Sequence, residues 1–457
     1  MKKPSLSFLG LEYAFALTIA IALAYSFWFF FTYKYFPQPF FYDIGDTWMD
    51  WFNPAFWSHQ PGAYDTYVTI YPPLTYVILR VVTYGPCYAG GVVGGLAREC
   101  DVLGIVALHI FYIIAVTLTA RTFWKVDRRT ALPRTIALSI GLPMIWTMDR
   151  GNVILITYIF VLLAYGPLVK SARMRWLYAG MAVNMKIYLI GTIFAQLLHR
   201  RWRWFEGAMI SCILVYCISY LLFGSGSPSE IYRNITDFAE NLTINNPLDI
   251  WMASSLLPLL QLTRSEIFPT ILYVGSDNVR LIEILAPLIM HSAQAIIMVA
   301  AAACFFRPEA VPRYRMVTLS IGIALLSTEV SSYTQILVLL FCFMEPSKGF
   351  LRRYAIVIGY LICIPLDINI DRLPPTYKDS FLFNTTVPVE YVVQLGPFIR
   401  PILTLSIPVS LAILTIINVW QDIRQQGWGE RWRFRRDVQL LPWLRRPQPP
   451  TPPASSV

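Results

Sequence analysis

Residues 9–33 read LGLEYAFALTIAIALAYSFWFFFTY, an almost unbroken apolar run. A helix needs about 20 apolar residues to cross the hydrocarbon core of a bilayer. Three further stretches have a similar length and character, at 102–123, 282–306 and 402–420. So many long apolar segments in a chain of 457 residues predict a polytopic membrane protein of the all-α class.

The composition of the chain favours the same class. Hydrophobic residues make up 56% of the sequence and charged residues only 14%, whereas soluble domains carry roughly 25% charged residues. The net charge of +10 would favour nucleic-acid binding in a soluble protein. Here the basic residues fall in short clusters between apolar runs, where the positive-inside rule places them. We therefore expect membrane lipids, and no nucleic acid, as partners.

The basic clusters predict one consistent topology. They lie at 125–129, 170–175, 200–203, 307–315 and 348–353, and arginines recur in the C-terminal tail. If all of them are cytoplasmic, both termini are inside and about 12 segments cross the membrane. Residues 1–421 then form the transmembrane domain, and 422–457 form an Arg- and Pro-rich cytoplasmic tail. The expected external connections are about 34–101, 224–280 and 367–400.

The segment between Arg175 and Arg203 is too short to hold the two full membrane spans that this topology requires. Only 27 residues separate the two arginines, and two full spans need about 20 residues each. Two short helices that meet near Asn184-Met185-Lys186 satisfy the charge rule. Non-helical backbone at membrane depth is tolerated where it lines a polar cavity, so we expect Lys186 to face a site.

The first external connection carries two candidate interfacial helices, at 50–58 and 74–84, since neither is long enough to cross comfortably. Cys87 and Cys100 fall in the same connection. An oxidising compartment would permit a disulfide between them, and the sequence leaves open whether it forms.

Three carboxylates, those of Asp43, Asp46 and Asp50, stand close together near the start of this connection. Acidic side chains at membrane depth are costly and usually functional. Asp46 and Asp50 are four residues apart, so a helix that began near Asp46 would place both on one face. Capping of that helix by Asp46 or Thr47 is the alternative, and it explains one acid but not two. We therefore predict a catalytic role for at least one of Asp46 and Asp50.

A series of short motifs follows this acidic stretch. They are Tyr64, Tyr-Pro-Pro-Leu at 71–74, Arg150-Gly151-Asn152, and Gly-Met-Ala-Val-Asn-Met-Lys-Ile-Tyr at 180–188. Together with Asp46, their order and spacing resemble the polyprenol-phosphate-sugar-dependent glycosyltransferases of the GT-C superfamily, and above all its branch of polyprenol-phosphate-mannose-dependent α-mannosyltransferases. The resemblance covers roughly residues 40–205, and beyond them it concerns topology alone.

This resemblance implies an inverting glycosyltransferase of a bacterial inner membrane, with its site on the external face. A sugar on a polyprenyl monophosphate would be the donor, and a hydroxyl of a glycolipid or glycan the acceptor. Asp46 or Asp50 would take the proton of that hydroxyl, while Lys186 and Arg150 would bind the donor phosphate. No cofactor is implied. The candidate pocket residues are Tyr64, Tyr71, Asn152, Tyr188, Glu329 and Tyr333.

The chain departs from the family pattern at two places. Leu189 stands where the family often has proline, and residues 327–333 (STEVSSY) hold no histidine where some members have one. Glu329 is the acid that this second segment offers instead. Paired acids such as Asp46 and Asp50 suit a divalent metal, but lysine and arginine alone can hold a monophosphate, so we expect no metal.

Two other functions remain open. A polysaccharide polymerase or O-antigen ligase is also polytopic with large external loops, but it would rely on external arginine and histidine. A non-enzymatic lipid or sugar transporter would carry buried charges along several spans, and charges within the apolar runs are few here. The residues identify neither the sugar nor the acceptor.

Overall fold

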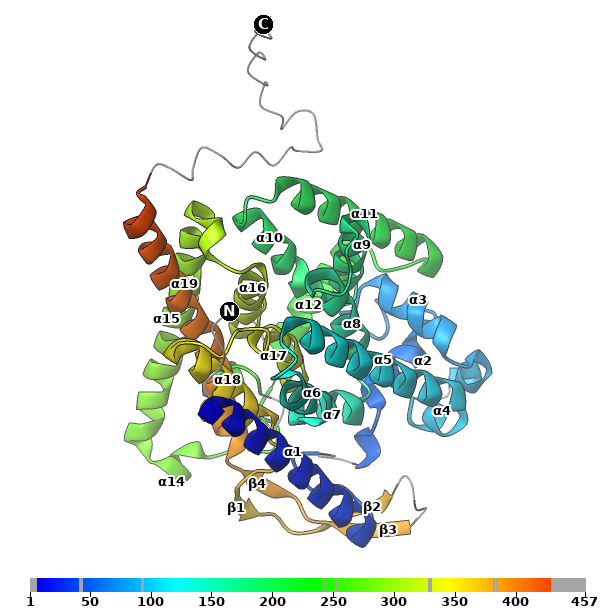
Figure 1. The fold of residues 1–457 in the computed structure, drawn as a ribbon. Coiled ribbons are helices and arrows are strands. Elements are labelled where there is room, and N and C mark those ends of the chain that lie inside the picture. Colours follow the sequence, from blue (N-terminus) through cyan, green and yellow to red (C-terminus); the bar gives the residue numbers. More distant parts are fainter. Residues whose placement is uncertain are drawn as a thin grey trace, which may run out of the picture.

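The computed structural model describes residues 6–40, 44–91, 94–241, 243–250, 253–327, 331–380, 383 and 385–428. In this part of the chain helices predominate (Figure 1), and five of them are long and apolar enough to cross a membrane. These five are α1 (Leu6–Tyr33), α5 (Val102–Val126), α11 (Trp202–Phe223), α15 (Ser276–Phe306) and α19 (Gly396–Gln426). The structure thus agrees with a helical membrane protein, and the count of about 12 segments stays a prediction.

Shorter helices form the centre of the bundle, and the long helices lie around them (Figure 1). The short helices are α6 (Ala131–Ile140), α7 (Leu142–Arg150), α8 (Ile154–Tyr165), α9 (Ala172–Val183), η3 (Ile187–Leu189), α10 (Ile190–Leu198), α16 (Arg313–Ser327), η5 (Ser332–Thr334), α17 (Gln335–Cys342) and α18 (Phe350–Cys363). Almost every residue of α8 and α17 is buried, as expected of a helix that is apolar on all sides.

The long helices expose much of their apolar surface. Leu17 on α1, Ile113 on α5 and Leu221 on α11 are 61%, 61% and 79% exposed. Contiguous apolar surface of this extent is rare on soluble monomers. It is stable against hydrocarbon, so the outer faces of these helices suit contact with lipid.

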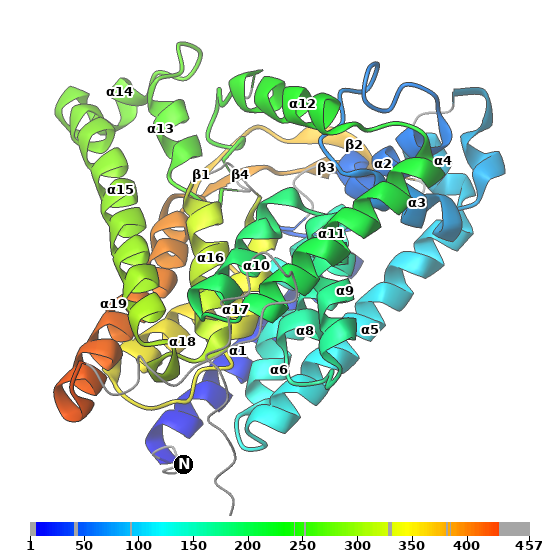
Figure 2. The ribbon, with the colours of Figure 1, turned by 90° about the horizontal axis from the view of Figure 1, so that it is seen from above.

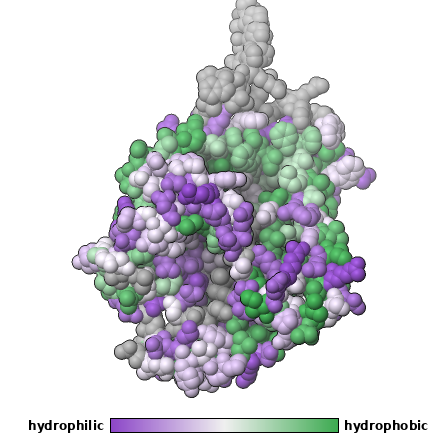
Figure 3. Space-filling model, turned by 180° about the vertical axis from the view of Figure 1, so that it is seen from behind, coloured by the Kyte–Doolittle hydropathy of each residue, from purple (hydrophilic) through white to green (hydrophobic). Residues whose placement is uncertain are grey.

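The three long connections gather at one end of the molecule, which we call the loop end (Figure 2). Their helices are η1 (Ile44–Asp46), α2 (Met49–His59), α3 (Pro73–Val82), η2 (Gly85–Gly91), α4 (Gly94–Cys100), α12 (Pro228–Asn241), α13 (Leu257–Thr263) and α14 (Thr270–Val274). Many hydrophilic side chains cover this end (Figure 3). The two short helices expected in the first connection are present as α2 and α3, within two residues of their predicted bounds, and their interfacial position stays a prediction.

The third connection contains β-structure that an all-helical prediction does not include. Strands β1 (Asn369–Arg372) and β4 (Val392–Gln394) pair antiparallel, with Asn369 opposite Gln394. Between them, β2 (Thr376–Ser380) pairs antiparallel with β3 (Thr385–Val389). Threonine and valine favour pleated backbone, and two short hairpin-like ladders satisfy their backbone groups outside the bundle.

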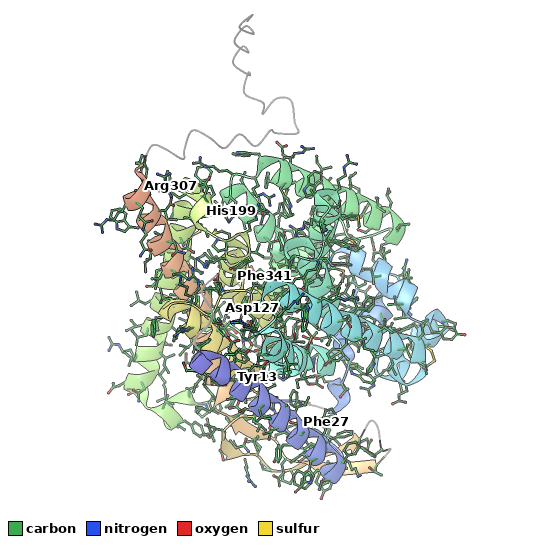
Figure 4. All side chains as sticks on the ribbon, viewed as in Figure 1. Tyr13, Phe27, Asp127, His199, Arg307 and Phe341 are labelled. Carbon is green, nitrogen blue, oxygen red and sulfur yellow. A yellow bond between two sulfur atoms is a disulfide. The ribbon has the colours of Figure 1, made fainter. Side chains whose placement is uncertain are left out.

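The opposite end of the molecule, which we call the basic end, carries the turns where the arginine clusters lie. Figure 4 marks Tyr13, Asp127, His199 and Arg307 there, on α1, after α5, after α10 and after α15. The 3-10 helix η4 (Pro308–Ala310) lies at this end as well. Helix α19 continues to Gln426, past the expected start of the tail at 422, and residues 429–457 lie outside the described part of the chain.

Buried ion pairs join the helices at the basic end. Arg134 on α6 contacts Glu12 on α1 at 2.8 Å, and both side chains are about 2% exposed or less. Arg134 also donates to Ser347 Oγ at 2.6 Å. Glu345, fully buried, accepts from Arg315 Nε at 2.6 Å and from Arg352 Nε at 3.1 Å. These contacts tie α1, α6, α16 and the α17–α18 turn together.

Candidate active site

The two acids of the first connection lie at the loop end, on either side of a break in the helix. Asp46 ends η1, and Asp50 stands in the first turn of α2. Trp48, between them, has a left-handed backbone (φ 63°) and no side chain caps α2. The expectation that one helix carries both acids on one face is therefore wrong, and neither Asp46 nor Thr47 acts as its cap.

Arg150 brings the two acids together instead. Its Nη1 donates to Asp46 Oδ2 at 2.6 Å, and its Nη2 lies 3.5 Å from Asp50 Oδ1. The Arg150 side chain is 12% exposed, whereas Asp46 and Asp50 remain 46% and 25% exposed. The carboxylates are therefore the parts of this cluster that a ligand can reach.

The end of α7 and the start of α2 contact each other through backbone. Trp48 N donates to Asp149 O at 2.8 Å. Gly151 ends α7 with a left-handed backbone (φ 66°), and a Cβ there would lie 3.0 Å from Trp48 Cα and from Trp51 Cβ. The contact places the carboxyl end of α7, with Arg150, against the amino end of α2, with Asp50. Arg150 lies in the last turn of α7, where the helix carries a partial negative charge, and Asp50 lies in the first turn of α2, where the partial charge is positive. Each side chain is therefore stabilised by the end of its own helix.

Asn152 links the next helix to the same cluster. Its Oδ1 accepts from Ile154 N at 2.9 Å in the first turn of α8. Its Nδ2 donates to Asp50 Oδ2 at 2.8 Å. The side chain is fully buried, so Asn152 fixes the orientation of the Asp50 carboxylate.

Lys186 lies where the sequence predicts a helix break. Helix α9 ends at Val183 and η3 begins at Ile187, with Lys186 in extended backbone between them. Its Nζ lies 4.5 Å from the centre of the Tyr71 ring, as in a cation–π contact. Burial disfavours the charged ammonium, and the charge of Asp50 offsets part of this cost. The predicted pair of short helices is confirmed, and its lysine belongs to the same site as the acids.

Three of the predicted tyrosines line this region. Burial raises the pKa of Tyr71, and the charge of Asp50 raises it further, so the hydroxyl stays protonated at neutral pH and can donate a hydrogen bond. The Tyr188 hydroxyl oxygen is buried and has no hydrogen-bond partner among the described residues. Tyr333, 9% exposed, lies in η5, which packs against α7.

Two predicted site residues stand apart from this cluster. Tyr64 is buried with Tyr76 and Phe223, and its hydroxyl donates to the backbone oxygen of Tyr71 at 2.7 Å. Tyr64 thus holds the backbone of Tyr71 through this hydrogen bond and belongs to a separate aromatic cluster. Glu329 lies outside the described residues, as does Asp43.

Arg98 holds the acidic segment in place, and the sequence analysis did not single it out. Its Nη1 donates to Thr47 O at 2.8 Å and to Gly45 O at 3.3 Å, the carbonyls on either side of Asp46. Arg98 belongs to α4, which the Cys87–Cys100 disulfide closes, so the bridge that the sequence left open is present. The only local signal for Arg98 is that it is a cation between these two cysteines.

Comparison of the chain with protein-family models, with curated proteins and with solved structures finds no match. The fold and the site therefore have to be interpreted from their own geometry. That geometry is two cationic side chains, Arg150 and Lys186, beside the partly exposed carboxylates of Asp46 and Asp50. Within the described residues, no group of three or more His, Cys, Asp and Glu side chains is suited to a metal ion.

Proposed function

We propose that the chain is an inverting membrane glycosyltransferase that takes its sugar from a polyprenyl-phosphate donor and works at the loop end. The observation that carries the proposal is the meeting of Asp46, Asp50, Arg150 and Lys186. These four charged side chains come from three segments far apart in the sequence, and the family resemblance implied that they share one site. The resemblance to the GT-C superfamily and its roughly 12-segment topology belong to this proposal.

The geometry favours Asp46 as the general base. One of its oxygens contacts Arg150, and the side chain is nearly half exposed. Asp50 is more enclosed, and its two oxygens face Asn152 and Arg150. Asp50 therefore suits a positioning role, in which it orients Arg150 and balances the charge of Lys186.

The reaction then uses a single displacement. The acceptor hydroxyl oxygen attacks the anomeric carbon, and its proton passes to the Asp46 carboxylate. The bond between the anomeric carbon and the phosphate oxygen breaks, and its electron pair leaves with the polyprenyl phosphate. Lys186 and Arg150 stabilise the charge that develops on this leaving group, which is most effective for preorganised cations shielded from water. In this proposal a hydroxyl of Tyr71 or Tyr188 binds the sugar or the phosphate.

The experiment is a transfer assay with the purified protein, a panel of polyprenyl-phosphate sugars and a lipid extract as acceptor. Asp46→Asn should lower kcat by about 10²–10⁴-fold, the usual contribution of a general base. Lys186→Met should lower kcat/KM for the donor. Asp65→Asn is the matched control, since Asp65 lies in the same connection and is 75% exposed. Its ion pair with Arg233 is long, at 3.8 Å, and exposed to solvent.

Transfer that survives in both Asp46→Asn and Asp50→Asn would exclude the proposed chemistry. Uptake or flipping of a lipid-linked sugar with no new glycosidic bond would instead favour the transporter. Transfer of a preassembled polysaccharide, unaffected by Asp46→Asn, would favour the polymerase or ligase.

A further inference from the structure

A cavity of about 580 Å³ opens at the basic end, away from the candidate active site. It lies between the amino ends of α9 and α11, and its lining includes Arg173, Arg201 and Arg203 with Trp176 and Trp204. Among the described residues that line it there is no acidic side chain. The cavity therefore concentrates positive charge that the proposed sugar transfer does not use.

The two helices that border the cavity add to its positive potential. Ser171 caps α9, and α11 begins at Trp202 directly after Arg201. Both helices thus direct their amino ends, which carry partial positive charge, toward the basic side chains. Three guanidinium groups and two helix amino ends favour a ligand with a phosphate group.

Two of these arginines, Arg173 and Arg203, are followed along their helices by exposed apolar side chains. Leu177 lies four residues after Arg173 on α9, and Ile210 lies seven residues after Arg203 on α11, so each pair shares a helix face. Leu177 and Ile210 are 38% and 41% exposed, and Leu214, one turn after Ile210 on α11, is 56% exposed. A free phosphate ion has no apolar surface to bury against these side chains, whereas the acyl chains of a lipid can cover them.

The aromatic side chains fit the same type of ligand. Trp204 is buried, and Trp176 packs flat on Gly207, where a Cβ would lie 2.5 Å from the indole ring. The Trp176 indole nitrogen has no hydrogen-bond partner among the described residues. Tryptophan is enriched at the level of lipid headgroups, because its ring is apolar and its N–H is a donor.

We propose that this cavity binds the headgroup of an anionic phospholipid, such as phosphatidylglycerol, from the leaflet at the basic end. The arginines contact the phosphate, and the acyl chains lie along the exposed apolar side chains of α9 and α11. Basic pockets between transmembrane helices commonly bind anionic headgroups in this way. The inference does not depend on the proposed glycosyltransferase activity.

The test measures lipid binding to the full-length protein by native mass spectrometry, from micelles that hold equal amounts of phosphatidylglycerol and phosphatidylcholine. Arg173→Gln with Arg203→Gln should weaken phosphatidylglycerol binding by roughly 30-fold, from about 1 kcal/mol per basic residue at a charged membrane surface. Both arginines are exposed, so the double variant keeps the fold. Adding Arg201→Gln should weaken binding further.

Arg128→Gln with Arg129→Gln is the matched control, because Arg128 lies at the same end and stacks on an exposed tryptophan, Trp124, at 5.5 Å. This control should keep phosphatidylglycerol bound. Equal losses in both double variants would mean unspecific attraction and would overturn the proposal, as would unchanged binding in Arg173→Gln with Arg203→Gln. Displacement of the lipid by millimolar inorganic phosphate would show a free-anion site and overturn the lipid assignment.

Discussion

At the scale of single residues, the candidate site depends on a glycine with no chemistry of its own. Gly151 stands between Arg150 and Asn152, the two residues that contact the acids. Its left-handed backbone turns the chain out of α7, and its missing side chain lets Trp48 and Trp51 approach. A side chain at this position would separate the end of α7 from the start of α2.

We predict that Gly151→Ala destabilises the protein by more than about 2 kcal/mol, because the left-handed backbone alone costs roughly 1–2 kcal/mol and the contacts with the two tryptophans add to it. Transfer activity should fall as well. Gly90→Ala is the control, since Gly90 also has a positive φ (72°) but no atom lies within 4 Å of its Cβ position. Thermal unfolding in lipid discs compares the stability of the two variants. Equal losses of stability would contradict the role of the close approach of Trp48 and Trp51 to Gly151.

Residue-level prediction succeeds here where a residue is anomalous for its surroundings. Asp46, Asp50 and Lys186 stand out as charges near apolar segments, and they do lie together. What the sequence does not show is the partner of each charge. Arg150 was expected to bind a phosphate, and the structure shows it between two acids that precede it by 104 and 100 positions in the chain. A local pattern carries no information on such a contact.

At the scale of elements, η2 and α4, which the Cys87–Cys100 disulfide joins, support the acidic segment. Asp101 accepts from Tyr88 Oη at 2.7 Å and from Gly104 N at 2.8 Å, so it fastens η2 to the start of α5. From the other side Arg98 holds the carbonyls next to Asp46. These two elements therefore connect a long helix to the proposed base.

We predict that Cys87→Ser with Cys100→Ser destabilises the protein by about 3 kcal/mol, the value expected for a loop of this size. The sequence separation of the two cysteines is 13. The rate of transfer should fall too, because α4 no longer fixes Arg98. Cys217→Ser, at an exposed free cysteine, should change neither quantity. An unchanged kcat in the double serine variant, with stability reduced, would show that the disulfide does not position Asp46.

The elements differ in how far their residues determine them. Pro72-Pro73 fixes the start of α3, and the short distance between arginine clusters fixes the break at Lys186. Both were predictable. The pairing of β1 with β4 was not predictable, because the paired residues are 20 to 25 positions apart and the strands have only four and three residues. Nor did any repeat or motif mark these strands.

At the scale of the whole molecule, the length rule for membrane spans identifies five helices in the described part of the chain and leaves the short, buried helices of the bundle uncounted. That rule assumes a helix surrounded by lipid. Helices α8 and α17 have 12 and 8 residues and most of their side chains are buried in protein, so the rule does not apply to them. A topology based on charge clusters includes such helices, whereas one based on hydrophobic length omits them.

The candidate site and the contact between α1 and α6 differ in how their charges are held, and the last prediction follows from this difference. At the site the carboxylates of Asp46 and Asp50 are partly exposed, as a ligand site requires. At the basic end Glu12 and Arg134 are buried, and Glu12 also accepts from Ser347 Oγ at 2.7 Å and Tyr360 Oη at 3.1 Å. Removing the charge of Glu12 leaves the Arg134 cation buried with carbonyl and hydroxyl partners only. Breaking a buried pair in this way costs about 3–5 kcal/mol.

Glu12→Gln should therefore lower stability by about that amount, as measured by equilibrium unfolding in mixed micelles. The neighbouring Tyr13→Phe removes only a 3.5 Å contact of an exposed hydroxyl with Arg129 O, so it should have almost no effect. Glu12→Gln combined with Arg134→Met should recover part of the loss, because no unpaired charge then remains buried. If Glu12→Gln and Tyr13→Phe unfold alike, the ion pairs do not hold the basic end together, and packing of α1 against α6 and α18 has to account for its stability.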